Sequence, residues 1–162
     1  MNNKTQIEIK RIDFNAFDDK TLGWICIEPT IQKMRSKNST IKSQVYAQLT
    51  SGQKSLLLFW ILYGHARHGI IQFFMEIDYL LKETDIWIEF NSRFKCFDDN
   101  DLLDLIKELR NLYIQERGIF KPDFDLTAND FDKKYNKIIP NSLKQISKYI
   151  RNNPNEFVHF TD

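Results

Sequence analysis

The stretch LTSGQKSLLLFWILYGHARHGIIQFF, residues 49–74, decides the fold class. Thr50 precedes Gln53 by three positions, which is the spacing of a capping box, where each side chain hydrogen-bonds the other residue's backbone amide at a helix start. The apolar run LLLFWILY, residues 56–63, follows at once. A buried strand can have the same composition, but the capping box and the leucines favour a central helix that is buried on all sides.

A polar junction separates this helix from the next apolar segment. Gly69 stands where a change of direction requires a backbone φ angle that glycine adopts easily. We expect the side-chain amide of Gln72 to satisfy backbone groups that the break leaves open. The polar side chains of the junction are also a candidate ligand or partner site: His65, Arg67, His68 and Gln72.

Apolar residues spaced three to four positions apart predict further helices on both sides of this stretch. Residues 6–12 alternate weakly and suggest a short strand or an extended arm. A helix around Trp24 is expected to end before Pro29, because proline disfavours helical geometry in the preceding residue. Residues 29–40 then form an exposed connection, and Thr40 caps the next helix.

The second half of the chain carries several signals for helix starts and ends. The expected boundaries are a break near Thr84, a start at Asp98, Asp99 and Asp101, an end at Gly118, a start at Thr127 with Asp130, a last helix with Pro140 in its first turn, and a stop at residues 152–154. The sequence therefore predicts an all-α fold, a single compact bundle of six or seven helices around a buried central helix pair.

Length and composition indicate one globular domain. With 162 residues, among them 13 Phe, 6 Tyr and 3 Trp, the chain can build a core without disulfides. Cys26 and Cys96 lie far apart and outside any paired motif, which is typical of thiols in a reducing compartment. The first residues lack an apolar secretion signal, and the longest apolar run is shorter than the roughly 18 residues of a membrane span. We expect a cytoplasmic protein, with residues 1–40 as an N-terminal arm and helix and residues 41–162 as the helical domain.

The net charge of +1 conceals a segregation of charge along the chain. Residues 29–75 contain no Asp or Glu, whereas residues 76–132 contain 15 acidic against 7 basic residues. The acidic block is expected to offer a partner-binding face composed of Asp98, Asp99, Asp101, Asp104 and Glu108. The basic segment 29–54 is an alternative site for nucleic acid, although it lacks interleaved aromatic residues and a recognisable reading helix.

Catalytic and metal-binding motifs are missing from the sequence. It contains no HExxH, P-loop, GxSxG, GxGxxG or CxxC pattern. The run of aspartates at residues 98–104 lacks the glycine and glutamate of a calcium-binding EF-hand loop. We therefore assign no catalytic residue, no metal ligand and no cofactor.

Two groups of residues resemble a known family. Leu49, Thr50, Gly52 and Gln53, with Trp60 in the apolar run and Gly69, Gln72, Phe73 and Phe74 after it, form the first group. The second is the closing motif Asn-Asn-Pro-x-Glu-Phe at residues 152–157. In both, the chain resembles the bacterial DNA-mimic-protein C-terminal-domain family, a family of unknown function, over residues 45–160. Lys54 replaces the family's arginine, and His68 and Ile70 replace a glycine and a phenylalanine.

The resemblance implies an acidic face that imitates the phosphates of DNA and occupies DNA-binding proteins. In this chain only residues 76–132 have the charge for such a face. We expect a non-enzymatic protein-binding domain with a regulatory or inhibitory role, whose partner is another protein rather than nucleic acid or a membrane; a homodimer stays open. The alternative is a small-ligand-binding or enzymatic domain centred on residues 65–72.

Overall fold

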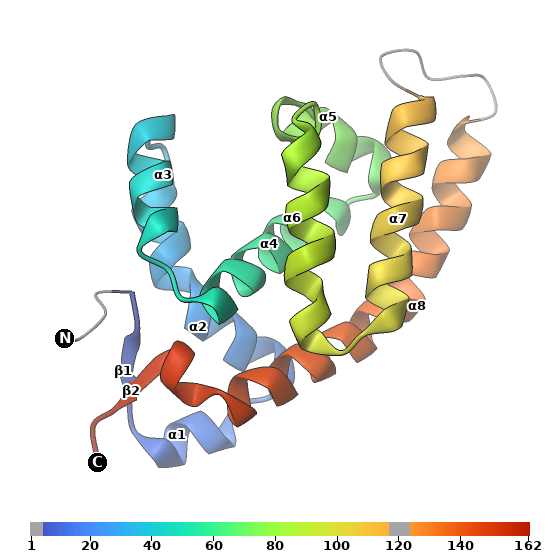
Figure 1. The fold of residues 1–162 in the computed structure, drawn as a ribbon. Helices are drawn as coiled ribbons and strands as arrows, with labels where there is room; N and C mark the ends of the chain where they lie inside the picture. Colours follow the sequence, from blue (N-terminus) through green and yellow to red (C-terminus); the bar gives the residue numbers. More distant parts are fainter. Residues whose placement is uncertain (1–4, 117–123) are drawn as a thin grey trace. The chain divides into compact units, whose positions relative to one another are not determined.

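The computed structural model describes residues 5–116 and 124–162, and the all-α prediction is confirmed (Figure 1). The described residues form eight α-helices, one more than the upper expectation, with two short 3-10 turns and one two-stranded sheet. The elements are β1 Ile7–Ile9, α1 Arg11–Ala16, α2 Asp19–Met34, α3 Ser39–Ala47, α4 Ser51–Ala66, α5 Ile70–Leu81, α6 Thr84–Phe94, η1 Lys95–Phe97, α7 Asn100–Gln115, α8 Phe124–Asn152, η2 Pro154–Glu156 and β2 Val158–Phe160.

The helical fold divides into two compact units. The first unit comprises residues 1–58 and 143–162, and the second comprises residues 59–142. Each of the long helices α4 and α8 contributes residues to both units. None of the helices within the described residues is both long and apolar enough to cross a membrane.

In the first unit the two ends of the chain pair with each other. Strands β1 and β2 are parallel, with Ile7 opposite Val158 and Ile9 opposite Phe160. The ring of Phe14 packs edge-on against the ring of Phe160, with 5.3 Å between centroids. The short strand expected within residues 6–12 is confirmed, while helix α1, which begins at Arg11, was not predicted.

The prediction that the second helix ends before Pro29 is wrong. Helix α2 continues through Pro29 to Met34, so the first half of the expected loop 29–40 is helical. Proline in a helix interior removes a hydrogen bond, but the residues before and after Pro29 share one buried face that includes Leu22, Cys26 and Thr30. Burial of that face offsets the lost bond. Asn38, not Thr40, then caps α3 by accepting from the backbone N–H of Ile41 at 2.9 Å.

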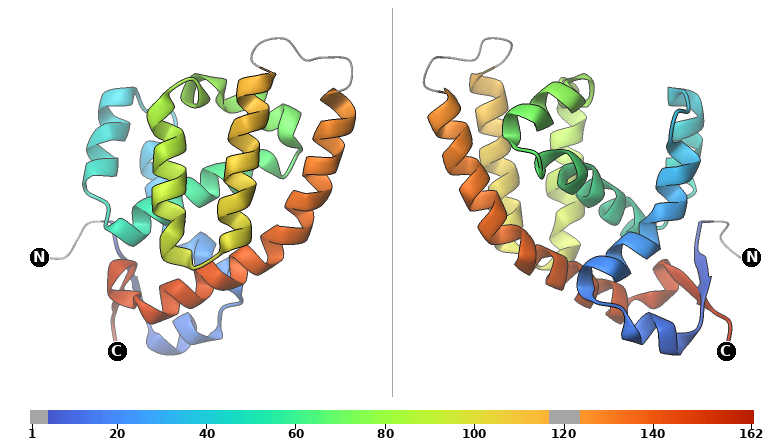
Figure 2. Two further views of the ribbon diagram at one scale, coloured as in Figure 1. Left: turned by 45° about the vertical axis from the view of Figure 1, so that its right-hand side comes forward. Right: turned by 180° about the vertical axis from the view of Figure 1, so that it is seen from behind.

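In the second unit, helices α6 and α7 lie antiparallel and side by side (Figures 1 and 2). The break between α5 and α6 falls next to Thr84, as predicted. Aromatic rings fill the core of the unit; the rings of Phe90 and Phe94 lie 5.6 Å apart and those of Phe94 and Phe97 lie 6.0 Å apart. This apolar packing holds the α6–α7 pair in place, and the predicted acidic face lies on α7 and the residues just before it.

The last two predicted helices are one. Helix α8 runs for 29 residues, so Thr127 and Pro140 lie inside it and neither begins a helix. An apolar stripe continues across Pro140 from Ile139 to Ile146, and both of those side chains are buried. Pro140 itself is exposed, so water can bond the carbonyl that loses its helical partner. The helix ends at residue 152, as predicted, and the expected end at Gly118 lies outside the described residues.

Candidate functional site

The capping box at the start of α4 is present as predicted. The backbone N–H of Gln53 donates to Oγ1 of Thr50 at 3.1 Å, and the backbone N–H of Thr50 donates to Oε1 of Gln53 at 3.0 Å. Gln53 also reaches the N-terminal segment: Oγ1 of Thr5 donates to Oε1 of Gln53 at 2.9 Å, and Nε2 of Gln53 donates to the carbonyl of Thr5 at 3.0 Å. The side chain of Gln53 is 0% exposed, so its role is internal.

The closing motif of the chain meets this same corner of the first unit. The backbone N–H of Gly52 donates to Oε2 of Glu156, and Oγ1 of Thr50 donates to the carbonyl of Glu156 at 3.0 Å. A Cβ atom on Gly52 would lie 2.6 Å from the Phe157 ring, so only glycine fits without movement. Thr50 and Gly52, from the first group of residues that resembles the family, therefore contact Glu156 and Phe157 of the closing motif, and these contacts hold the first unit together. Trp60 is likewise buried, against Tyr63 with 5.0 Å between centroids.

The junction between α4 and α5 has the backbone geometry that was predicted but a different cap. Gly69 has φ +102°, in the region that favours glycine. The open backbone N–H of Ile70 donates at 2.9 Å to Oδ1 of Asp132, a residue of α8. Burial raises the pKa of the Asp132 carboxyl above its ordinary value. The expectation that the Gln72 amide serves these backbone groups is wrong, because Nε2 of Gln72 donates to Oε1 of Glu76 at 2.7 Å.

The polar side chains of the junction form an exposed hydrogen-bonded cluster. Nδ1 of His65 bonds Oε2 of Glu76, and Nε of Arg67 donates to Nε2 of His68 at 3.1 Å. Hydrogen bonds from Gln72 and then from His65 lower the pKa of the Glu76 carboxyl. Across the described parts of the chain, no three His, Cys, Asp or Glu side chains converge to hold a metal ion. The ligand site centred on residues 65–72 stays a prediction.

The five acidic residues singled out on and before α7 do not all face outward. Asp99 is 3% exposed and caps α7, accepting from the backbone N–H of Leu102 at 3.1 Å and from Oγ of Ser142 at 2.6 Å. Asp99 is therefore a structural residue. Glu108 is bound by Nζ of Lys134. Three carboxylates at the start of α7 are exposed, Asp98, Asp101 and Asp104, and the last of these pairs with Lys107 at 3.1 Å.

Local ion pairs reduce the negative charge of the segment 76–132. Lys82 pairs with Asp78 at 2.6 Å, Arg93 with Glu89 at 3.0 Å, Lys107 with Asp104 at 3.1 Å and Lys133 with Asp130 at 3.5 Å. Most of these pairs join residues three or four positions apart on one helix. The acidic surface is consequently short and adjoins basic side chains.

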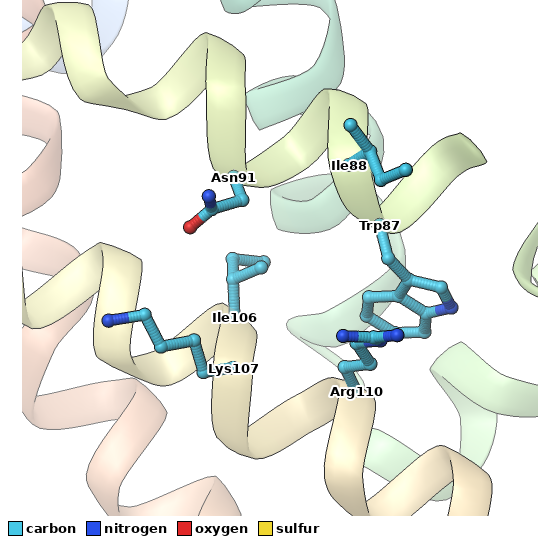
Figure 3. Close-up of a pocket in the computed structure, with 6 residues that line it drawn as sticks. All are labelled: Trp87, Ile88, Asn91, Ile106, Lys107 and Arg110. Atoms are coloured by element: carbon cyan, nitrogen blue, oxygen red, sulfur yellow. The ribbon is translucent and has the colours of Figure 1, made fainter. Parts of the chain in front are cut away.

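A hollow of about 320 Å³ lies on the surface of α6 and α7, where Ile106, Lys107 and Arg110 of α7 and Trp87, Ile88 and Asn91 of α6 line it (Figure 3). The side chains of Trp87, Ile88 and Ile106 supply its apolar part, and those of Lys107 and Arg110 lie along the α7 side (Figure 3). Ile88 is 62% exposed and is one of several large apolar side chains that the described residues expose. No motif in the sequence predicts this hollow. Its one local signal is the placement of Ile88 among the polar positions of α6.

Comparison with protein-family models, with curated proteins and with solved structures found no match to this chain.

Proposed function

We propose that this chain is a non-enzymatic protein-binding domain, with a regulatory or inhibitory role, that binds a partner polypeptide over the outer face of α6 and α7. The observation that carries the proposal is the hollow beside three exposed carboxylates at the start of α7. Protein interfaces combine an apolar anchor pocket with a polar and charged rim, and this face offers both.

The charges around the hollow define the partner's chemistry. Lys107 and Arg110 lie at the hollow itself, so an acidic group next to the partner's anchor residue would be favoured there. Asp101 lies six residues before Lys107, about 9 Å along the helix axis, so basic partner residues would be favoured at that distance. A partner segment would therefore have an apolar anchor residue for the hollow, an acidic residue on one side of it and two or three basic residues on the other. Such a segment complements both the hollow and the carboxylates at the start of α7.

The resemblance to the DNA-mimic-protein C-terminal-domain family supports the same direction, since such a domain occupies the basic surface of a DNA-binding protein. In this chain the exposed carboxylates suited to that role are Asp98 and Asp101, together with Asp104, whose charge Lys107 partly compensates. Asp99 serves the fold, and the bond from Lys134 compensates the charge of Glu108. The basic part of a partner would therefore contact only the first five residues of α7 and Asp98, two residues before the helix.

Capture from a lysate of the source organism, after nuclease treatment, tests the proposal. The immobilised wild type is compared with Ile88→Asp and with the double variant Asp101→Lys/Asp104→Lys. Ile114→Asp is the matched control for the hollow, because Ile114 is an exposed isoleucine of the same helix pair. Asp13→Lys/Asp125→Lys is the matched control for the charge change, because both residues are exposed and lie outside α7.

We expect a protein that is retained by the wild type and by both controls and that is reduced at least about 30-fold with Ile88→Asp, the effect of losing about 2 kcal/mol at an anchor position. The double variant should lose the same protein, and its retention on the wild type should fall as salt is raised. Identical retention by all five chains would contradict the proposal.

A further inference from the structure

The first unit carries a helical hairpin with positive charge and no acidic residue. We call residues 29–47, the second half of α2 with the turn and α3, the basic hairpin (Figure 1). Residues 29–58 contain five Lys or Arg residues and no Asp or Glu. The sequence predicts an exposed connection over residues 29–40 and a helix that starts at Thr40, but α2 continues to Met34 and α3 begins at Ser39. Because most of the segment is helical, the backbone positions of its charges are defined.

Four of the cations gather at the tip of the hairpin. Lys33 lies in the last turn of α2, Arg35 and Lys37 lie in the connection, and Lys42 lies in the first turn of α3. Ser36 closes the connection with φ +57°, and the Asn38 cap at 2.9 Å fixes the start of α3. Since a helix rises 1.5 Å per residue, the backbone positions of Lys33 and Lys42 both lie within about 5 Å, along their helices, of the connection.

The surface of α3 is polar and carries no buried residue. Its exposed side chains include Ser39, Thr40, Ser43 and Gln44, which bear hydroxyl or amide groups. The aliphatic Ile41 is only 37% exposed. Within residues 5–116 and 124–162, no acidic side chain forms an ion pair with Arg35, Lys37 or Lys42. The tip is therefore a compact group of cations next to hydrogen-bonding side chains.

We infer that the basic hairpin binds the phosphate backbone of a nucleic acid duplex. Contacts to phosphate come from Lys and Arg together with Ser, Thr, Asn and Gln side chains, and these are the residue types at the tip. A protein partner would bind best at an apolar anchor site, and the large apolar side chains of α3 are Ile41, 37% exposed, with the half-buried Val45 and Tyr46, so polar and basic groups outnumber them at the tip. The inference goes beyond the proposed function, because the hairpin belongs to the first unit and the hollow on α6 and α7 to the second.

Salt dependence measures how many phosphates are contacted. The affinity for B-DNA falls with salt with a logarithmic slope of about −0.9 per neutralised phosphate, so four cations predict a slope of about −3.6. Between 50 and 200 mM salt this slope corresponds to an affinity loss of about 150-fold. Fluorescence anisotropy with a labelled 20-base-pair DNA of mixed sequence measures the slope in the full chain. A duplex RNA of the same sequence shows which duplex is preferred.

The test variant is Arg35→Gln/Lys37→Gln/Lys42→Gln. Its matched control is Lys137→Gln/Lys144→Gln/Lys148→Gln, which removes the same charge from three exposed lysines of α8. We expect the test variant to reduce the steepness of the slope by about 2.7 and the control to leave it unchanged. Circular dichroism confirms that both variants keep the wild-type helix content.

Three results would overturn the inference: no binding of either duplex at 50 mM salt, an equal loss with both triple variants, or an unchanged slope with the test variant. A further arm replaces the duplex with a labelled polyglutamate peptide. If this peptide binds through the same three cations and neither duplex binds, an acidic protein occupies the hairpin instead.

Discussion

Replacing Gln53 with alanine removes the side chain that joins the start of α4 to the N-terminal segment of the first unit. Three hydrogen bonds disappear: two to Oε1, from the Thr50 backbone and the Thr5 hydroxyl, and one from Nε2 to the Thr5 carbonyl. Each bond contributes about 1 kcal/mol, and a buried group left without a partner costs about 1–3 kcal/mol. Thr5 is 3% exposed, so the two hydrogen bonds that it makes with Gln53 are lost away from water.

The expected loss is about 3–4 kcal/mol of unfolding free energy, after a few tenths are returned by the better helix propensity of alanine. For a chain of this size that loss lowers the melting temperature by about 6–16 °C. Urea unfolding followed by circular dichroism at 222 nm measures the change, with equal slopes required for the comparison. Gln44→Ala, an exposed glutamine of α3, is the control and should change stability by less than about 0.5 kcal/mol. A loss below about 1 kcal/mol for Gln53→Ala would refute the reasoning.

Three further predictions concern the junction and the thiols. Gly69→Ala should cost about 1–3 kcal/mol because its φ of +102° is open to glycine, whereas Gly64→Ala, whose new Cβ meets no atom within 4 Å, should be neutral or stabilising; thermal melting compares them. The raised pKa of the Asp132 carboxyl means that the folded state holds this proton more tightly than the unfolded state, so the stability of the wild type should fall relative to Asp132→Asn as pH rises from 3.8 through the raised value. Urea unfolding at several pH values measures the sign of this change. A relative rise in wild-type stability would be inconsistent with a carboxylate whose pKa burial raises. Burial raises the pKa of the Cys26 thiol to about 12, so a thiol reagent at pH 8 should modify Cys96 in the native protein and Cys26 only after unfolding. Rapid modification of both thiols in the native protein would contradict this prediction.

Local signals in the sequence predicted local structure correctly. The Thr50–Gln53 capping box, the positive φ of Gly69 and the break near Thr84 each depend on residues within one helical turn. The predictions that a single proline ends or begins a helix were wrong. Helices α2 and α8 continue through Pro29 and Pro140, since burial of an apolar stripe several turns long outweighs one missing backbone hydrogen bond.

The candidate sites likewise combine features that the sequence predicts with features that depend on the tertiary structure. Composition and charge blocks identified the acidic and basic segments, and those segments are continuous in sequence. Which charges are available to a partner depends on contacts between distant residues: Ser142 binds Asp99 across 43 residues, and Lys134 binds Glu108 across 26. The hollow on α6 and α7 is also formed by residues of two helices.

The sequence by itself determined that this chain is helical, where its central helix begins and where its charges are concentrated. These features depend on residues close together in the sequence, which set helix starts and periodic apolar faces. Only the tertiary structure decided that Asp132 caps α5 across 62 residues and that Glu156 and Phe157 close on Gly52. The physical reason is that a buried backbone amide can bond any acceptor that the fold brings within hydrogen-bond distance, and a glycine can pack against any ring that the fold brings into van der Waals contact. Separation along the chain does not specify either group.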